Sequence, residues 1–120
     1  MNHLDPMPQE DVIKLFDKNL ATSVQLAAFS SWRFKLKKPF NIFRIKVLYE
    51  SCDYVPGIKI VTYVPVAGQV GTSYGNPASI DTDEEIKWID ITNMNNYDVD
   101  IAEIIAEIFQ ITACFPIPTP

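Results

Sequence analysis

Six of the ten basic residues of this 120-residue chain lie within fourteen positions, interleaved with aromatic residues. These residues, with no acidic residue among them, are Arg33, Lys35, Lys37, Lys38, Arg44 and Lys46. The positions after this segment hold eleven acidic residues against two lysines, so a chain of net charge −5 is strongly polarised. Clustered cations can contact phosphates or the acidic surface of a protein. The polarity predicts a charged partner, and a second copy of the chain would satisfy it.

Two kinds of partner fit the basic segment. Aromatic rings beside Lys and Arg are typical of proteins that bind single-stranded nucleic acid. At strand spacing, however, Trp32 and Phe34 point to the face opposite the charged side chains. An acidic pI of 4.7 also disfavours nucleic acid. We therefore expect the segment to contact protein subunits, with nucleic acid as the alternative partner.

Residues suited to catalysis are scarce. His3 is the only histidine and precedes the first expected element, so no nucleophile has an imidazole base on a rigid element. Cys52 and Cys114 are predicted to be free thiols in a reducing compartment. Asp53 or the acidic residues at 81–85 could be the catalytic carboxylates of a small enzyme, but we expect these residues to lie in solvent-exposed turns. We predict no enzyme activity, no catalytic residue and no cofactor.

One segment resembles a metal-binding loop without meeting its requirements. Residues 96–100, with Glu107 at the twelfth position, echo a calcium loop, but Ile101 stands where that loop requires glycine. No spacing of cysteine and histidine suits zinc. We therefore predict no metal site.

Hydrophobic periodicity predicts a helix near each end of the chain, at 8–29 and at 99–115. The second of these is so apolar that only a narrow polar strip remains, which contains Glu103 and Glu107. Like charges one helical turn apart repel each other. We therefore expect this pair of carboxylates to bind a cation supplied by a partner.

Alternation of apolar and polar residues predicts four strands, at 32–37, 41–51, 58–66 and 86–92. Pro39 separates the first two strands because proline cannot donate to a β-ladder. The turn at 52–57 is predicted to join the second and third strands as an antiparallel hairpin. Residues 67–85 hold three of the four glycines and are predicted to form a long loop arm.

These elements predict a single α+β domain over residues 1–120, with an N-terminal helix, an antiparallel sheet of about four strands and a C-terminal helix packed on the sheet. The segments 1–7 and 116–120 are expected to be extended tails. No stretch is long and apolar enough to span a membrane, and the first residues lack the pattern of a signal peptide. The chain is therefore expected in the cytoplasm or within an assembled particle, without a membrane partner.

The predicted function is that of a non-enzymatic assembly subunit of a larger complex, of the kind found in the neck or tail of a phage. In this hypothesis the basic strand, the loop arm and the tails contact other copies of the chain or other protein subunits, giving a homo-oligomer. A nucleic-acid-binding accessory protein that uses residues 33–46 is the alternative. The predicted partner-binding residues are Arg33, Lys35, Lys37, Lys38, Arg44, Lys46, Glu103 and Glu107.

Overall fold

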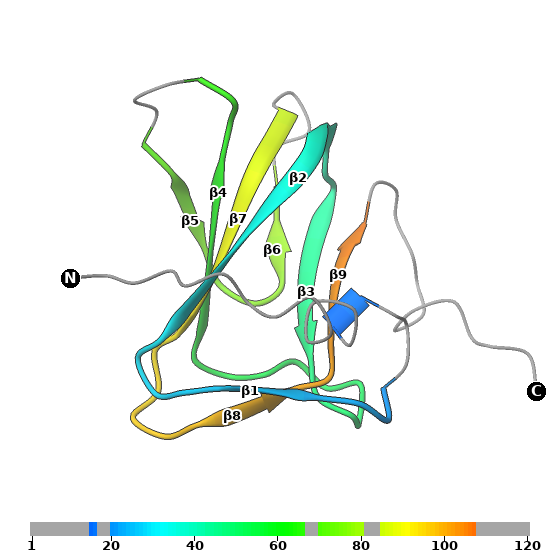
Figure 1. Ribbon diagram of the computed structural model, residues 1–120, viewed down its shortest axis with the longest axis vertical. Coiled ribbons are helices and arrows are strands. Elements are labelled where there is room, and N and C mark those ends of the chain that lie inside the picture. The colour runs from blue at the N-terminus through cyan, green and yellow to red at the C-terminus, as the bar shows by residue number, and fades with distance from the viewer. Residues whose placement is uncertain (1–14, 17–19, 67–69, 81–84, 108–120) are drawn as a thin grey trace, which may run out of the picture.

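The chain folds as a β-sandwich (Figure 1). A computed structural model describes residues 15–16, 20–66, 70–80 and 85–107, apart from the side chains of Lys37 and Phe40. Nine strands lie in these ranges and no helical element does, although Leu15 and Phe16 have helical backbone. The predicted α+β class is therefore wrong.

The larger sheet contains β2 (Ser31–Asn41), β4 (Ile58–Tyr63), β5 (Thr72–Tyr74) and β7 (Glu85–Asn93). All neighbours are antiparallel, in the order β2-β7-β4-β5. The strands predicted at 32–37, 58–66 and 86–92 are confirmed over most of their lengths. Pro39 does not end β2, but the register with β7 shifts between Lys35 and Phe40, where proline cannot donate.

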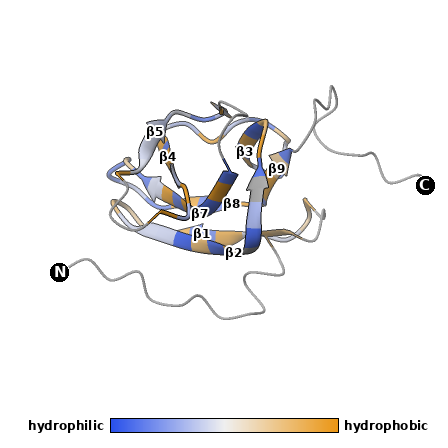
Figure 2. Cartoon of the chain, turned by 90° about the horizontal axis from the view of Figure 1, so that it is seen from above, coloured by the Kyte–Doolittle hydropathy of each residue, from blue (hydrophilic) through white to orange (hydrophobic). Residues whose placement is uncertain are grey.

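The smaller sheet contains β3 (Arg44–Leu48), β6 (Ala78–Ser79) and β9 (Glu103–Glu107), in the order β6-β3-β9. A separate antiparallel pair, β1 (Val24–Leu26) with β8 (Val99–Ile101), lies beside one end of the two sheets (Figure 1). Figure 2 shows the strands surrounding a common interior. That interior is rich in β-branched residues, which pack well on pleated strands; they include Ile45, Val47, Ile60, Ile89, Ile91 and Ile104.

The predicted hairpin of the second and third strands is wrong, because β3 and β4 belong to different sheets. The chain between them crosses from one sheet to the other. Val55 anchors this crossing: its side chain is buried, and its backbone N–H donates to the Val47 carbonyl at 3.1 Å.

The predicted loop arm at 67–85 is wrong where the structure describes it. Residues 70–80 contain β5 and β6, which pair with β4 and β3 respectively. Asn76 fastens this segment to the smaller sheet, because its amide donates to the Val47 carbonyl at 2.8 Å and to the Val55 carbonyl at 3.0 Å. The remaining parts of the predicted arm, 67–69 and 81–84, lie outside the described residues, as do the predicted tails.

The predicted helix at 99–115 is wrong over 99–107, where the chain forms β8 and β9. Val99 and Ile101 are buried at strand spacing, and the backbone then turns a corner at Ala102, whose N–H donates to the Leu48 carbonyl at 2.8 Å. The corner shifts the alternation of inward and outward side chains, so Ile101 and Ile104 are both buried although they are three positions apart. Two strands out of phase therefore imitate the spacing of a helix. Residues 108–115 lie outside the described ranges.

The predicted helix at 8–29 is wrong over 20–29. Val24, Gln25 and Leu26 pair with residues 99–101, more than seventy positions away. Long-range pairing of this kind outweighs a local apolar pattern.

The prediction of a free thiol is wrong for Cys52, which is disulfide-bonded. The described residues contain no free cysteine. The chain's other cysteine, Cys114, lies outside these residues. Cys52 sits in the turn that follows β3, where its N–H donates to the Tyr49 carbonyl at 2.9 Å.

We expect Cys52→Ser to lower the free energy of unfolding by about 2–4 kcal/mol, the usual contribution of a native disulfide. Urea unfolding of the variant and of the reduced parent chain measures this effect. Both should lose the same stability, and reducing agent should not destabilise the variant further. Rapid alkylation of Cys52 in the native, unreduced chain would show instead that the thiol is free.

Candidate functional site

The structure divides the predicted basic segment between two sheets. Arg33, Lys35 and Lys38 lie on β2 with exposed side chains, and Lys37 lies on the same strand with its side chain outside the description. Arg44 and Lys46 lie on β3 in the smaller sheet, where Arg44 is half-buried and Lys46 is 3% exposed. The six cations therefore do not form one continuous surface.

Arg33 forms a two-pronged ion pair with Asp90 on the neighbouring strand. Its Nε donates to Asp90 Oδ1 at 2.7 Å and its terminal nitrogen donates to Oδ2 at 2.8 Å. The guanidinium also lies over the Tyr63 ring, 5.0 Å from the centroid. The adjacent carboxylate raises the pKa of Arg33, chiefly through this hydrogen bond. Arg33 is thus fixed in place by its own chain, with 42% of its side chain still exposed.

Glu103 and Glu107, predicted on a helix, lie instead on β9 and are almost completely buried. The cation that we expected from a partner comes from the same chain: Lys46 Nζ is 3.2 Å from Glu107 Oε1. Arg44 Nε lies 3.9 Å from the same oxygen. Opposite charges on the paired strands β3 and β9 thus lie beside each other within the smaller sheet. Binding of a partner by these four residues stays a prediction.

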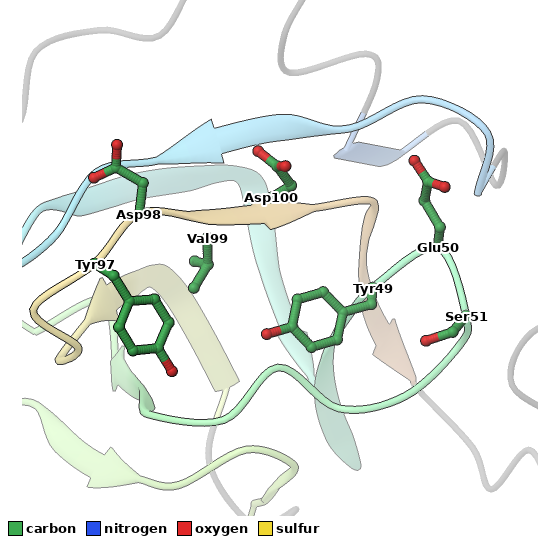
Figure 3. Close-up of a pocket in the computed structure, with 7 residues that line it drawn as sticks. All are labelled: Tyr49, Glu50, Ser51, Tyr97, Asp98, Val99 and Asp100. Carbon is green, nitrogen blue, oxygen red and sulfur yellow. The ribbon is translucent and has the colours of Figure 1, made fainter.

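The described residues also form a pocket of about 450 Å³ that the sequence patterns did not reveal. It lies between the turn after β3 and the strand β8 with the loop before it (Figure 3). The lining holds two tyrosines, three carboxylates and no basic residue: Tyr49, Glu50, Ser51, Tyr97, Asp98, Val99 and Asp100. A formal charge of −3 therefore surrounds this pocket at neutral pH.

The two tyrosines approach the pocket from opposite sides, with Val99 between them (Figure 3). Tyr97 is 52% exposed, whereas Tyr49 is half-buried and packs against the core. Burial raises the pKa of the Tyr49 phenol, and the nearby Tyr97 and Asp100 raise it further. Tyr49 therefore stays protonated at neutral pH and can donate a hydrogen bond as well as present its ring.

Asn93, at the end of β7, holds the loop that carries Tyr97. Its buried amide nitrogen donates to the carbonyls of Leu26 at 3.1 Å, Ala27 at 3.3 Å and Tyr97 at 2.9 Å. Its side-chain oxygen accepts from the Asn95 N–H at 2.9 Å. One side chain thus fixes the loop at 94–98 to the strand β1 and its following turn.

Asp98 makes a second connection between these loops, because its Oδ1 accepts from the Ala28 N–H at 3.0 Å. The neighbouring Phe29 is 67% exposed, and Met94 is 51% exposed. Met94 is held through its N–H, which donates to the Gly57 carbonyl at 2.8 Å. Apolar side chains therefore stand on the loops at the same end of the sandwich as the acidic pocket.

Sequence reasoning placed Glu50 in a predicted strand, and Asp98 and Asp100 in the calcium-loop-like segment at the start of a predicted helix, so the three were given no common site. They meet because β3 pairs with β9, with Leu48 opposite Glu103, so that the turn after β3 lies beside β8, and this contact is long-range. A local signal did exist in the Tyr-Asp and Tyr-Glu pairs, Tyr97-Asp98 and Tyr49-Glu50. Such pairs are too common to identify a pocket without the fold.

Among the described residues there is no group of three or more His, Cys, Asp or Glu side chains arranged to hold a metal ion. The same part of the chain contains no helix that is long and apolar enough to cross a membrane.

No protein-family model and no curated protein matches this sequence. The fold is similar to the crystal structure of the F5/8 type C domain of a protein from Bacteroides fragilis, with a TM-score of 0.56. The two chains are 14% identical, and the match covers 76% of each. At this identity the likeness concerns the fold, and we conclude that the described strands form an F5/8 type C-like β-sandwich.

Proposed function

We propose that this chain is a non-enzymatic interaction module and that the acidic pocket, lined by Tyr49 and Tyr97, binds a cationic group of a protein partner. The observation that supports this most directly is the pocket's composition: three carboxylates and two tyrosines, with no lysine or arginine among the lining residues. A ligand that fills such a pocket must bring positive charge, or the carboxylates lose hydration without compensation. A lysine or arginine side chain meets this requirement.

The geometry supplies two kinds of contact for such a side chain. An ammonium or guanidinium group between Tyr49 and Tyr97 would lie near the rings, which attract cations through their π faces. Asp100 and Glu50 would then accept its hydrogen bonds, since charged acceptors bind such donors most strongly. Phe29 and Met94 offer apolar surface at the same end of the sandwich. We therefore expect a partner segment in which basic and apolar residues are adjacent.

The likeness to an F5/8 type C domain is compatible with this non-enzymatic role. It gives no support to a component of a phage particle, and that part of the prediction is not retained. The hypothesis that residues 33–46 contact the acidic surface of a neighbouring subunit also loses support. Arg33, Arg44 and Lys46 already lie beside carboxylates of their own chain.

We expect a short lysine-rich peptide to bind the chain at low salt and to shift the NMR signals of Tyr49 and Tyr97. Asp100→Asn should weaken this binding by roughly two- to ten-fold, the range for an exposed charge contact. Glu85→Gln is a matched control, because it removes one exposed carboxylate from β7 outside the pocket. The affinity of the Glu85→Gln variant for the peptide should change little.

A peptide affinity that is equal in Asp100→Asn and Glu85→Gln would contradict the proposal, because overall charge would then explain the binding. Peptide binding that is insensitive to salt would contradict it as well, because contacts other than charge would then hold the peptide. A mass above 13.6 kDa in light scattering at low salt, lost in Asp100→Asn, would identify a second copy of the chain as the partner.

The disulfide at Cys52 supports a further part of the proposal, which concerns location. Disulfides persist in oxidising compartments and are rare where thiols are kept reduced. We therefore propose that the chain works in an oxidising environment and not in the reducing one that its two cysteines first indicated. Thiol alkylation of the chain in its native cells, before lysis, tests this: protection of Cys52 is expected.

A further inference from the structure

The fold brings aromatic rings and cations together on one face of the larger sheet, although they are separated in the sequence. Lys35 on β2 is opposite Trp88 on β7, and Trp88 is opposite Tyr63 on β4. Residues directly opposite each other on antiparallel strands point to the same side. Trp32 and Phe34, which alternate with the cations in the sequence, pack against the core instead. The rings that accompany the cations therefore come from neighbouring strands.

Two further cations lie on this same face. Arg33 is opposite Asp90, which is opposite Val61. Lys59 precedes Val61 and Tyr63 at strand spacing and is exposed. We define the outer basic face as Arg33, Lys35, Lys59, Tyr63 and Trp88.

The central ring of this face is held in a defined position. A Cβ atom at Gly71 would lie 2.6 Å from Tyr63 Cε2 and 2.5 Å from Val61 Cγ1, so the ring lies where only glycine leaves room. The Arg33 guanidinium covers the ring from another direction at 5.0 Å, and Asp90 fixes that guanidinium by two hydrogen bonds. Preorganised rings and planar guanidinium groups lose little freedom on binding, which favours affinity.

The charges of this face differ from those of the chain as a whole. Asp90 neutralises Arg33, but Lys35 and Lys59 form no ion pair with any described residue. Their side chains are exposed on a molecule of net charge −5. Along β4, Lys59 and Tyr63 are four residues apart, which corresponds to about 13 Å. Two positive charges thus flank a surface of half-buried aromatic rings.

We propose that the outer basic face binds single-stranded nucleic acid, with bases stacked against Trp88 and the Arg33–Tyr63 pair and phosphates at Lys35 and Lys59. Flat rings beside lysines are the combination that single strands require, because every base has a face to stack and every nucleotide a phosphate. A duplex hides its base faces. An uncharged sugar would leave the lysines without a role. The proposal concerns a different surface from the acidic pocket and does not depend on it.

Fluorescence titration of the full chain with an oligothymidine of about 20 nucleotides tests the proposal at about 50 mM salt, where electrostatic contacts are strong. Stacking should quench Trp88, one of two tryptophans in the chain. Two phosphate contacts predict that affinity falls roughly five- to ten-fold between 50 and 200 mM salt. Trp88→Leu should weaken binding by roughly five- to one hundred-fold, whereas Trp88→Phe, which keeps a ring, should retain most of it.

Matched substitutions separate charge from fold. Lys35→Gln combined with Lys59→Gln should remove the salt dependence of oligonucleotide binding. Lys35→Arg combined with Lys59→Arg should preserve it. Equal affinity for a duplex, or equal effects of Trp88→Leu and Trp88→Phe, would overturn stacking. Binding of a sulfated polysaccharide with no binding of the oligonucleotide would assign the face to acidic glycans and reject the proposal. Asp100→Asn should bind the oligonucleotide as the parent chain does, even if it loses the lysine-rich peptide, because Asp100 lies outside the outer basic face.

Discussion

We expect Lys46→Met to lower the free energy of unfolding by about 3–5 kcal/mol, the cost of removing one member of a buried ion pair. Lys46 and Glu107 are 3% and 1% exposed, and their charged atoms are 3.2 Å apart. Without the ammonium group, the Glu107 carboxylate stays in the same enclosed position. Arg44 Nε at 3.9 Å offsets only part of this cost, because it lies beyond hydrogen-bonding distance.

Urea unfolding at constant m-value measures the change. Lys35→Met is the matched control, since it removes an exposed lysine from a strand and should alter stability by no more than about 0.5 kcal/mol. Lys46→Met combined with Glu107→Leu should recover most of the loss, because an apolar pair can replace a buried ion pair at little cost. Additive destabilisation in the double variant would show that Lys46 acts independently of Glu107.

This ion pair also shows what the sequence could and could not reveal. The repulsion between Glu103 and Glu107, from which we inferred their need for a cation, was argued from helical spacing, and the strand β9 does not have that spacing. The assumption that a partner supplies the cation depended on a helix, and it failed because β9 pairs with β3, more than fifty positions earlier. Charges on strands are neutralised across the ladder, which spacing along one strand cannot show.

The strands themselves were predicted where alternation is uninterrupted. Along β2, Trp32 and Phe34 alternate with Arg33 and Lys35, and both their faces were predicted correctly. The prediction failed at 99–107 because the corner at Ala102 shifts the alternation by one residue. It also failed to pair β2 with β7, and so missed that Trp88 and Tyr63 share a face with the cations. Strand order depends on contacts that no local pattern contains.

We expect Asn93→Ala to lower the free energy of unfolding by about 2–4 kcal/mol and to weaken binding at the acidic pocket. Asn93 is 0% exposed, and its side chain makes four hydrogen bonds that alanine cannot replace. Three backbone carbonyls and the Asn95 N–H would each lose a partner, and buried polar groups without partners are costly. The Tyr97 carbonyl is among them, so the loop that carries this pocket residue would lose one of its attachments.

Asn96→Ala is the matched control, because Asn96 lies in the same loop with an exposed side chain. Its stability should remain within about 0.5 kcal/mol of the parent chain. Urea unfolding compares the two variants, and amide hydrogen exchange at 94–98 reports whether the loop opens more readily, as local unfolding requires. Faster exchange there, together with weaker lysine-peptide binding in Asn93→Ala alone, would show that a buried amide positions the pocket. If the two variants exchange and bind alike, the pocket is held by other contacts, of which the Asp98 bond to the Ala28 N–H is the first to test.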